Sequence, residues 1–113
     1  MGPLRTLVLF GAEVTDTGLK ELAPLETLQE LNLQETRVTD KGVKELTALK
    51  ALKSLCLLGT QVTDAGLKDL AGLKSLQTLN LNFTTVTDAG VKELRKALPK
   101  CEVIPNIGPP FPE

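Results

Sequence analysis

Glycine recurs every 24 residues along most of this chain, each time within the same short motif. The four glycines are Gly18, Gly42, Gly66 and Gly90, and each follows the tripeptide V-T-D after one intervening residue. Glycine inside a helix costs about 1 kcal/mol relative to alanine, so its regular return requires a structural reason. Self-similarity at such a period indicates a stacked array, in which each unit contacts mainly its neighbours.

Each unit contains two hydrophobic periods in succession. Leu31 and Leu33 are two residues apart, as in a short strand that buries one face. Val43, Leu46 and Leu49 are three apart, which places them along one side of a helix. One unit of strand, turn and helix is too small to bury its own leucines, whereas stacked units bury them against one another.

The stretch LQELNLQETRVTD, residues 28–40, matches L-x-x-L-x-L followed by a polar ladder residue and a second apolar residue. This pattern resembles the leucine-rich-repeat family over residues 4–104, and the helical half is similar to its ribonuclease-inhibitor-like and cysteine-containing classes. The resemblance implies an α/β fold: a right-handed solenoid with a parallel sheet on the concave face and helices on the convex face. We expect a solenoid over residues 1–104, with about four repeats and a final strand, and a proline-rich tail over residues 105–113.

Threonine occupies the ladder position, where the family often has asparagine or cysteine. These residues are Thr36, Thr60 and Thr84, and we expect them to point inward and to hydrogen-bond the neighbouring turn backbone. At the helix start, Thr63 or Asp64 is expected to accept hydrogen bonds from free amides of the first turn. Gly66 is expected to lie against the turn of the next repeat, where a side chain would push the layers apart. A backbone nest for an anion is the alternative, but recurrence in every repeat favours the structural role.

The sequence offers little for catalysis. Histidine is absent, so the usual general base and the commonest metal ligand are missing. A row of aspartates recurs one layer apart, and helix capping explains it better than a calcium ladder. Cys56 has no histidine to activate it, and Cys101 lies two layers away at roughly 10 Å, so both thiols are expected to be free. We therefore expect no enzyme activity, no cofactor and no metal site.

Charge and hydropathy exclude two further classes. The formal net charge is -1 with acids and bases interleaved, which gives no reason to expect nucleic-acid binding. The apolar runs are only a few residues long, so no membrane span is expected, and no signal peptide is visible. A cytoplasmic location is the default expectation.

The concave face is the predicted binding surface. Its central column should hold Val8, Asn32, Cys56, Asn80 and Ile104, and the column beside it Phe10, Gln34, Leu58, Asn82 and Asn106. Neither column is charged, and a charge-free sheet with exposed apolar side chains is typical of a protein-contact surface, although apolar strand formers are common on sheets in any case. The candidate protein-binding residues are Val8, Phe10, Asn32, Gln34, Cys56, Leu58, Asn80, Asn82 and Phe83.

The expected function is a non-catalytic protein–protein interaction module with an unknown protein partner. Alternatives are a structural fragment of a longer repeat array, or an accessory domain of a larger enzyme or ubiquitin-ligase-type adaptor. Pro105 ends the leucine pattern, because proline cannot donate to a ladder, whereas Leu4 and Leu7 begin the pattern at once. An apolar end with an unpaired strand edge predicts a weak homodimer through the N-terminal end.

Overall fold

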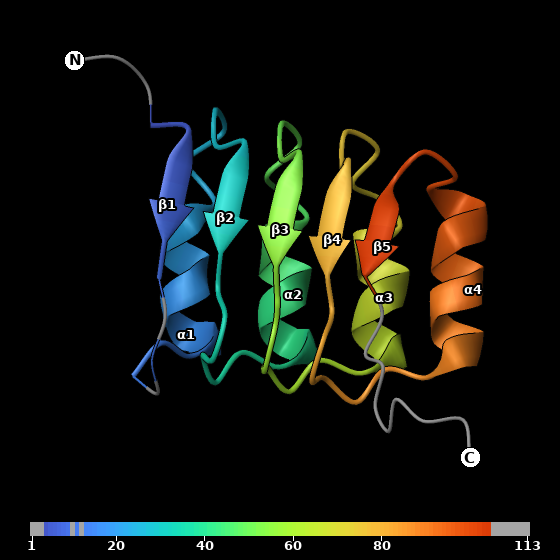
Figure 1. The fold of residues 1–113 in the computed structure, drawn as a ribbon. Helices are drawn as coiled ribbons and strands as arrows, with labels where there is room; N and C mark the ends of the chain where they lie inside the picture. Colours follow the sequence, from blue (N-terminus) through green and yellow to red (C-terminus); the bar gives the residue numbers. More distant parts are fainter. Residues whose placement is uncertain (1–3, 10, 12, 105–113) are drawn as a thin grey trace.

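Five short parallel strands form one sheet in the computed structural model, which describes residues 4–9, 11 and 13–104. The strands lie in chain order, side by side (Figure 1). They are β1 Thr6–Val8, β2 Glu30–Asn32, β3 Ser54–Cys56, β4 Thr78–Asn80 and β5 Glu102–Ile104. Leu31 pairs with Leu55, and Leu55 with Leu79, so equivalent residues of successive units lie in register.

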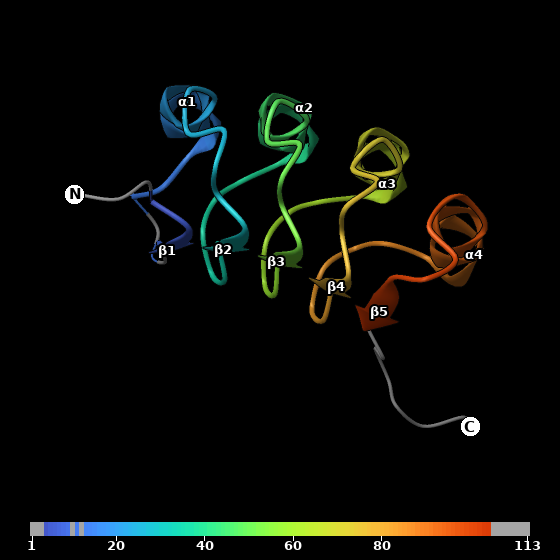
Figure 2. The same ribbon diagram turned by 90° about the horizontal axis from the view of Figure 1, so that it is seen from above.

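A helical segment follows each of the first four strands and returns the chain to the start of the next strand (Figure 1). The segments are α1 Asp16–Leu19 with the 3₁₀ helix η1 Lys20–Leu22, then α2 Asp40–Leu46, α3 Asp64–Leu70 and α4 Asp88–Ala97. In Figure 2 the helices lie on one side of the sheet and spread more widely than the strands, so theirs is the convex side. The predicted α/β solenoid is confirmed.

The core is a stack of leucine and valine layers between the sheet and the helices. Leu31 is 2% exposed and Leu33 is 0% exposed, as the strand period predicts, and the helical residues Val43 and Leu46 are also buried. Leu49 is equally buried but lies beyond α2, which ends at Leu46. The three-residue spacing thus continues from the helix into the following turn, and its last member contributes to the core from there.

The ladder threonines point inward, as predicted. Each is 4% exposed, and its hydroxyl donates to the carbonyl three residues earlier in the same repeat. For Thr60 the acceptor is the Leu57 carbonyl, at 2.7 Å. No buried side-chain nitrogen or oxygen among the described residues lacks a hydrogen-bond partner. Threonine is therefore compatible with the apolar core because the strand end satisfies its hydroxyl.

The C-terminal layer departs from the repeat by one residue. Helix α4 has 10 residues where α3 has 7, and Lys100, at the position of a core leucine, is exposed. The Cys101 amide donates to the Leu98 carbonyl at 3.0 Å, and both of these residues are buried. Cys101 therefore fills the space that a leucine fills in earlier turns. The predicted tail, residues 105–113, lies outside the described residues, as does Phe10.

Candidate functional site

The aspartates at the helix starts join consecutive repeats. Asp40 Oδ1 accepts a hydrogen bond from the Thr63 amide at 2.8 Å, and its Oδ2 accepts one from the Thr63 hydroxyl. The Thr63 hydroxyl in turn accepts from the Ala65 amide at 3.3 Å, which caps α3. Of the two expected cap residues, Thr63 therefore serves its own helix, whereas Asp64 serves the next repeat through Thr87.

The repeated glycines make room for these carboxylates. A Cβ on Gly66 would lie 2.5 Å from Asp40 Oδ1 and 3.0 Å from Val62 Cγ1. The prediction that a side chain would not fit here is supported, but the expected neighbour was wrong. The group that occupies the space is the aspartate of the preceding repeat, because that side chain extends forward onto the start of the next helix.

We call this arrangement the inter-repeat cap. It consists of an aspartate, the helix-start threonine of the next repeat and the glycine three residues after that threonine. The three sets are Asp16 with Thr39 and Gly42, Asp40 with Thr63 and Gly66, and Asp64 with Thr87 and Gly90. The anion beside the glycines is thus the protein's own carboxylate, which explains the glycines without an external anion.

No metal-binding cluster of three or more histidine, cysteine, aspartate or glutamate residues occurs in the part of the chain that the structure describes. Three of the four helix-start aspartates already accept two hydrogen bonds each. Carboxylates held in this way stabilise the stack and are poorly placed to act as general bases. Among the described residues, no helix has the length and apolar composition needed to cross a membrane.

The concave face has the predicted central column. Val8, Asn32, Cys56, Asn80 and Ile104 lie opposite one another in successive strands. Two of the carboxamides also shape the turns that follow the strands, since Asn32 Oδ1 accepts from the Gln34 amide and Asn80 Oδ1 from the Asn82 amide, both at 2.9 Å. These asparagines therefore have a structural task besides any contact with a partner.

The candidate residues differ widely in exposure. Val8, in the first strand, is 53% exposed, and Phe83, in the turn after the fourth of the five strands, is 73% exposed. The remaining described candidates are half-buried: Asn32, Gln34, Cys56, Leu58, Asn80 and Asn82. Phe83 also has a positive φ of 61°, which a bulky residue rarely adopts. A large apolar side chain is therefore presented at a constrained turn after β4.

The expectation of a charge-free sheet is wrong. A third column lies on the same face, two residues before the central one, and consists of Thr6, Glu30, Ser54, Thr78 and Glu102. Glu30 and Glu102 are exposed, and Glu30 Oε1 accepts from the Thr6 hydroxyl at 2.9 Å. Residues two apart in a strand share a face, so this column contributes negative charge to one edge of the surface.

The two cysteines have different surroundings. Both are free thiols, as predicted, with Cys56 half-buried on the concave face and Cys101 buried in the last layer. Burial raises the pKa of the Cys101 thiol, and the neighbouring Glu102 carboxylate raises it further. A hollow of about 290 Å³ lies beside Cys56, lined also by Val8 and Asn32.

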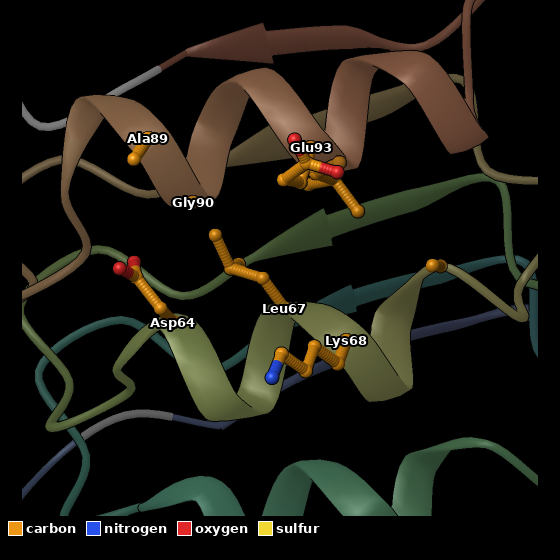
Figure 3. A pocket seen from close by; sticks show the side chains of 8 residues that line it. Asp64, Leu67, Lys68, Ala89, Gly90 and Glu93 are labelled. Carbon is orange, nitrogen blue, oxygen red and sulfur yellow. The ribbon is translucent and has the colours of Figure 1, made fainter.

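A larger groove, of about 460 Å³, lies on the convex side between α3 and α4. Figure 3 shows Leu67 and Lys68 on α3 across from Gly90 and Glu93 on α4. The Asp64 carboxylate at one end already accepts two hydrogen bonds from Thr87, one on each oxygen. The groove could not be predicted from the sequence, because it depends on how widely neighbouring helices spread, and the pattern of a single repeat does not show that spread.

Comparison with known proteins gives a consistent result. A family model described as Leucine Rich repeat matches residues 3–23, 25–46 and 72–94, together more than half of the chain. No curated protein sequence matches the chain.

Several solved structures share the fold. A leucine-rich-repeat protein of Leptospira interrogans is 31% identical with a TM-score of 0.59; the match covers 74% of this chain and 21% of the Leptospira chain. The Mex67:Mtr2 subunits of Chaetomium match with 20% identity and a TM-score of 0.70, over 88% of this chain and 78% of that one. An internalin of Listeria monocytogenes matches with 23% identity and a TM-score of 0.58, over 88% of this chain and 34% of that one.

The present chain thus spans about a fifth of the length of the Leptospira protein. The family model marks units in the first, second and fourth repeats, and the structure adds the third in the same register. Sequence motif, strand register and structural neighbours all agree, and this protein belongs to the leucine-rich repeat family.

Proposed function

We propose that this protein is a non-catalytic interaction module that binds another protein through its concave face. Leucine-rich-repeat domains commonly mediate protein–protein interaction and are typically non-catalytic. The observation that carries the proposal is the exposure of large apolar side chains. Among the described residues, the only large apolar side chains that are exposed belong to Leu4, Val8 and Phe83. Val8 stands in the central column and Phe83 at the turn that leaves β4.

The surface between them suits an extended partner. Half-buried carboxamides and Cys56 form the middle of the central column, so polar contacts are available between the apolar side chains of Val8 and Phe83. Apolar anchors surrounded by polar groups are typical of protein interfaces. Glu30 and Glu102 add negative charge along one edge, which favours a partner with lysine or arginine at that edge.

Phe83 occupies a turn position with a left-handed backbone conformation. The same position has a positive φ in all four repeats: 117° at Gly11, 61° at Glu35, 74° at Gly59 and 61° at Phe83. A left-handed conformation costs roughly 1–2 kcal/mol for an L-residue. The turn is thus common to the repeats, and the fourth repeat is distinguished by the exposed aromatic side chain that its turn carries.

The test is a selection of peptide ligands followed by mapping. A displayed library of random peptides is selected on the immobilised protein, and the affinities of the winning peptides are measured by calorimetry. We expect Val8→Ser or Phe83→Ser to weaken binding at least about tenfold, since apolar anchors carry most interface energy. Lys44→Ser, on the exposed side of α2, is the matched control and should leave the affinity unchanged.

Selected peptides that are insensitive to both concave substitutions would contradict the proposal. If their binding instead falls with Lys68→Ser or Glu93→Ser, the convex groove between α3 and α4 is the preferred contact surface.

A further inference from the structure

The N-terminal end of the solenoid has an incomplete inter-repeat cap. The helix-start threonine of the first repeat, Thr15, makes no side-chain cap hydrogen bond, whereas Thr39, Thr63 and Thr87 each accept one from their own helix. Within the described residues, no carboxylate bonds to the amide or hydroxyl of Thr15, although each of the other three threonines receives an aspartate.

The glycine of that cap is present, but the space beside it is empty. A Cβ built on Gly18 would meet no atom of the described residues within 4 Å, and Gly18 is exposed. At Gly42, Gly66 and Gly90 the same construction meets an aspartate of the preceding repeat. The first repeat thus carries the threonine and the glycine of the cap, and lacks only the carboxylate.

The apolar part of the same end is also incomplete. Leu4 is 45% exposed, and Leu7, Leu9 and Val14 are half-buried where their counterparts in the second repeat are buried. Strand β1 pairs with β2 and with no other strand among the described residues. We define the N-terminal face as these four side chains, the free edge of β1, Thr15 and Gly18.

We infer that the N-terminal face is a docking surface for one further leucine-rich repeat whose helix begins with aspartate. Three interfaces inside this molecule show how such a repeat would fit. Each pairs a strand edge, buries the leucines beneath it, and places an aspartate on the threonine and beside the glycine. The unfilled features of the N-terminal face are the same set, so the occupant is defined by its chemistry: apolar layer, parallel strand and helix-start carboxylate.

A second copy of this chain does not supply that occupant. At its C-terminal end, Asp88 is exposed, but β5 already occupies the strand place of the next layer. An incoming β1 would pair beyond β5, which puts its helix one layer too far from Asp88. Two N-terminal faces in contact would bring no aspartate to Thr15, since Asp16 extends to Thr39. The homodimer expected from the sequence would therefore leave the cap unfilled.

The test supplies the occupant in the same polypeptide. A copy of residues 28–51 placed directly before Leu4 keeps the repeat in phase, and its copy of Asp40 then faces Thr15 and Gly18. In the original chain, Gly18→Ala should leave the melting temperature unchanged or raise it. In the extended chain, Gly18→Ala should lower the melting temperature by about 4 °C or more, because the new carboxylate needs the space. Extension with alanine in place of the copied aspartate should remove that penalty.

Hydrogen exchange gives an independent readout. The Thr15 amide should exchange at least about tenfold more slowly in the aspartate-bearing extension than in the alanine-bearing one. The inference is overturned if Gly18→Ala has the same effect in all three chains, or if Thr15 gains no protection. A second extension made from residues 52–75 guards against a poor choice of graft, and loss of the fold in both extensions also counts against the inference. A stable dimer of the original chain that protects Thr15 would assign the face to a second copy instead.

Discussion

Replacement of Gly66 by alanine sets two effects against each other. Helix propensity alone favours the substitution by about 1 kcal/mol. The inter-repeat cap opposes it, because the new Cβ would lie 2.5 Å from Asp40 Oδ1. An ordinary van der Waals contact needs at least about 3.4 Å, so the carboxylate must retreat by about 1 Å.

That retreat breaks the contacts that hold consecutive repeats together. The hydrogen bond from the Thr63 amide to Asp40 is 2.8 Å long, and a displacement of this size takes it out of hydrogen-bonding range. Hydrogen bonds to a charged group contribute about 1.5–3 kcal/mol each, and partial exposure of Asp40 lets water replace some of that. Loss of both bonds costs roughly 2–4 kcal/mol, so the net destabilisation is about 1–3 kcal/mol. The melting temperature should fall by about 4–12 °C.

Thermal unfolding followed by far-ultraviolet circular dichroism is the appropriate assay, since the chain has no tryptophan or tyrosine for fluorescence. Gly18→Ala is the matched control, because none of the residues that the structure describes lies within 4 Å of the new Cβ and only the propensity effect remains. In an Asp64→Ala background, Gly90→Ala should become harmless, since the nearest atoms to its Cβ all belong to Asp64. A rise in melting temperature with Gly66→Ala, equal to that with Gly18→Ala, would refute the reasoning.

Three further predictions concern single side chains. At pH 8 a maleimide should label half-buried Cys56 much faster than Cys101, because burial restricts access to Cys101 and the raised pKa of its thiol keeps it protonated. Peptide mass mapping measures the labelling of both cysteines, and equal rates would contradict the assigned burial. Gly59→Ala should cost about 1 kcal/mol in chemical denaturation, since φ is 74° there and an L-residue is strained, and an unchanged midpoint would count against that conformation. Thr60→Val should cost about 1 kcal/mol in the same assay, because the Leu57 carbonyl loses the hydroxyl bond, and a gain in stability would show that this bond contributes nothing.

The stability effect of Cys101 depends on pH in a defined direction. Its folded-state pKa lies above the ordinary value of 9.0, so the folded protein keeps the proton where the unfolded chain loses it. Its contribution to stability is therefore complete below pH 9 and should be lost as the pH rises through the raised folded-state pKa. A comparison of the melting temperatures of the original protein and Cys101→Ala between pH 7 and 10 should show a difference that narrows at the alkaline end.

Much of the architecture could be predicted because the spacing of apolar residues within each short repeat indicates which segment is a strand and which is a helix. The two-residue spacing of Leu55 and Leu57 and the recurrence of the motif were sufficient for the strand, the helix and the register of the central column. The ladder threonines followed from the same alignment. Equivalent positions are buried in every layer of a stack, so the same burial pattern is expected at each repeat of the sequence.

Contacts between layers were less accessible to sequence reasoning. The helix-start position of Asp64 predicts a cap for its own helix, whereas its partner Thr87 lies 23 residues further on. The two predicted columns of the concave face do not include Glu30, although it lies two residues before Asn32 in β2 and so shares its face.

The sequence by itself determined the fold class, the period, the inward leucines and the absence of histidine chemistry, since these depend on local spacing and composition. Only the tertiary structure decided what the glycines are for, where the convex groove opens and why the N-terminal end differs from every other layer. These features arise where one repeat meets the next. Their geometry depends on the separation of stacked backbones and the spread of the helices, and a carboxylate can cross that gap only where the facing residue has no side chain.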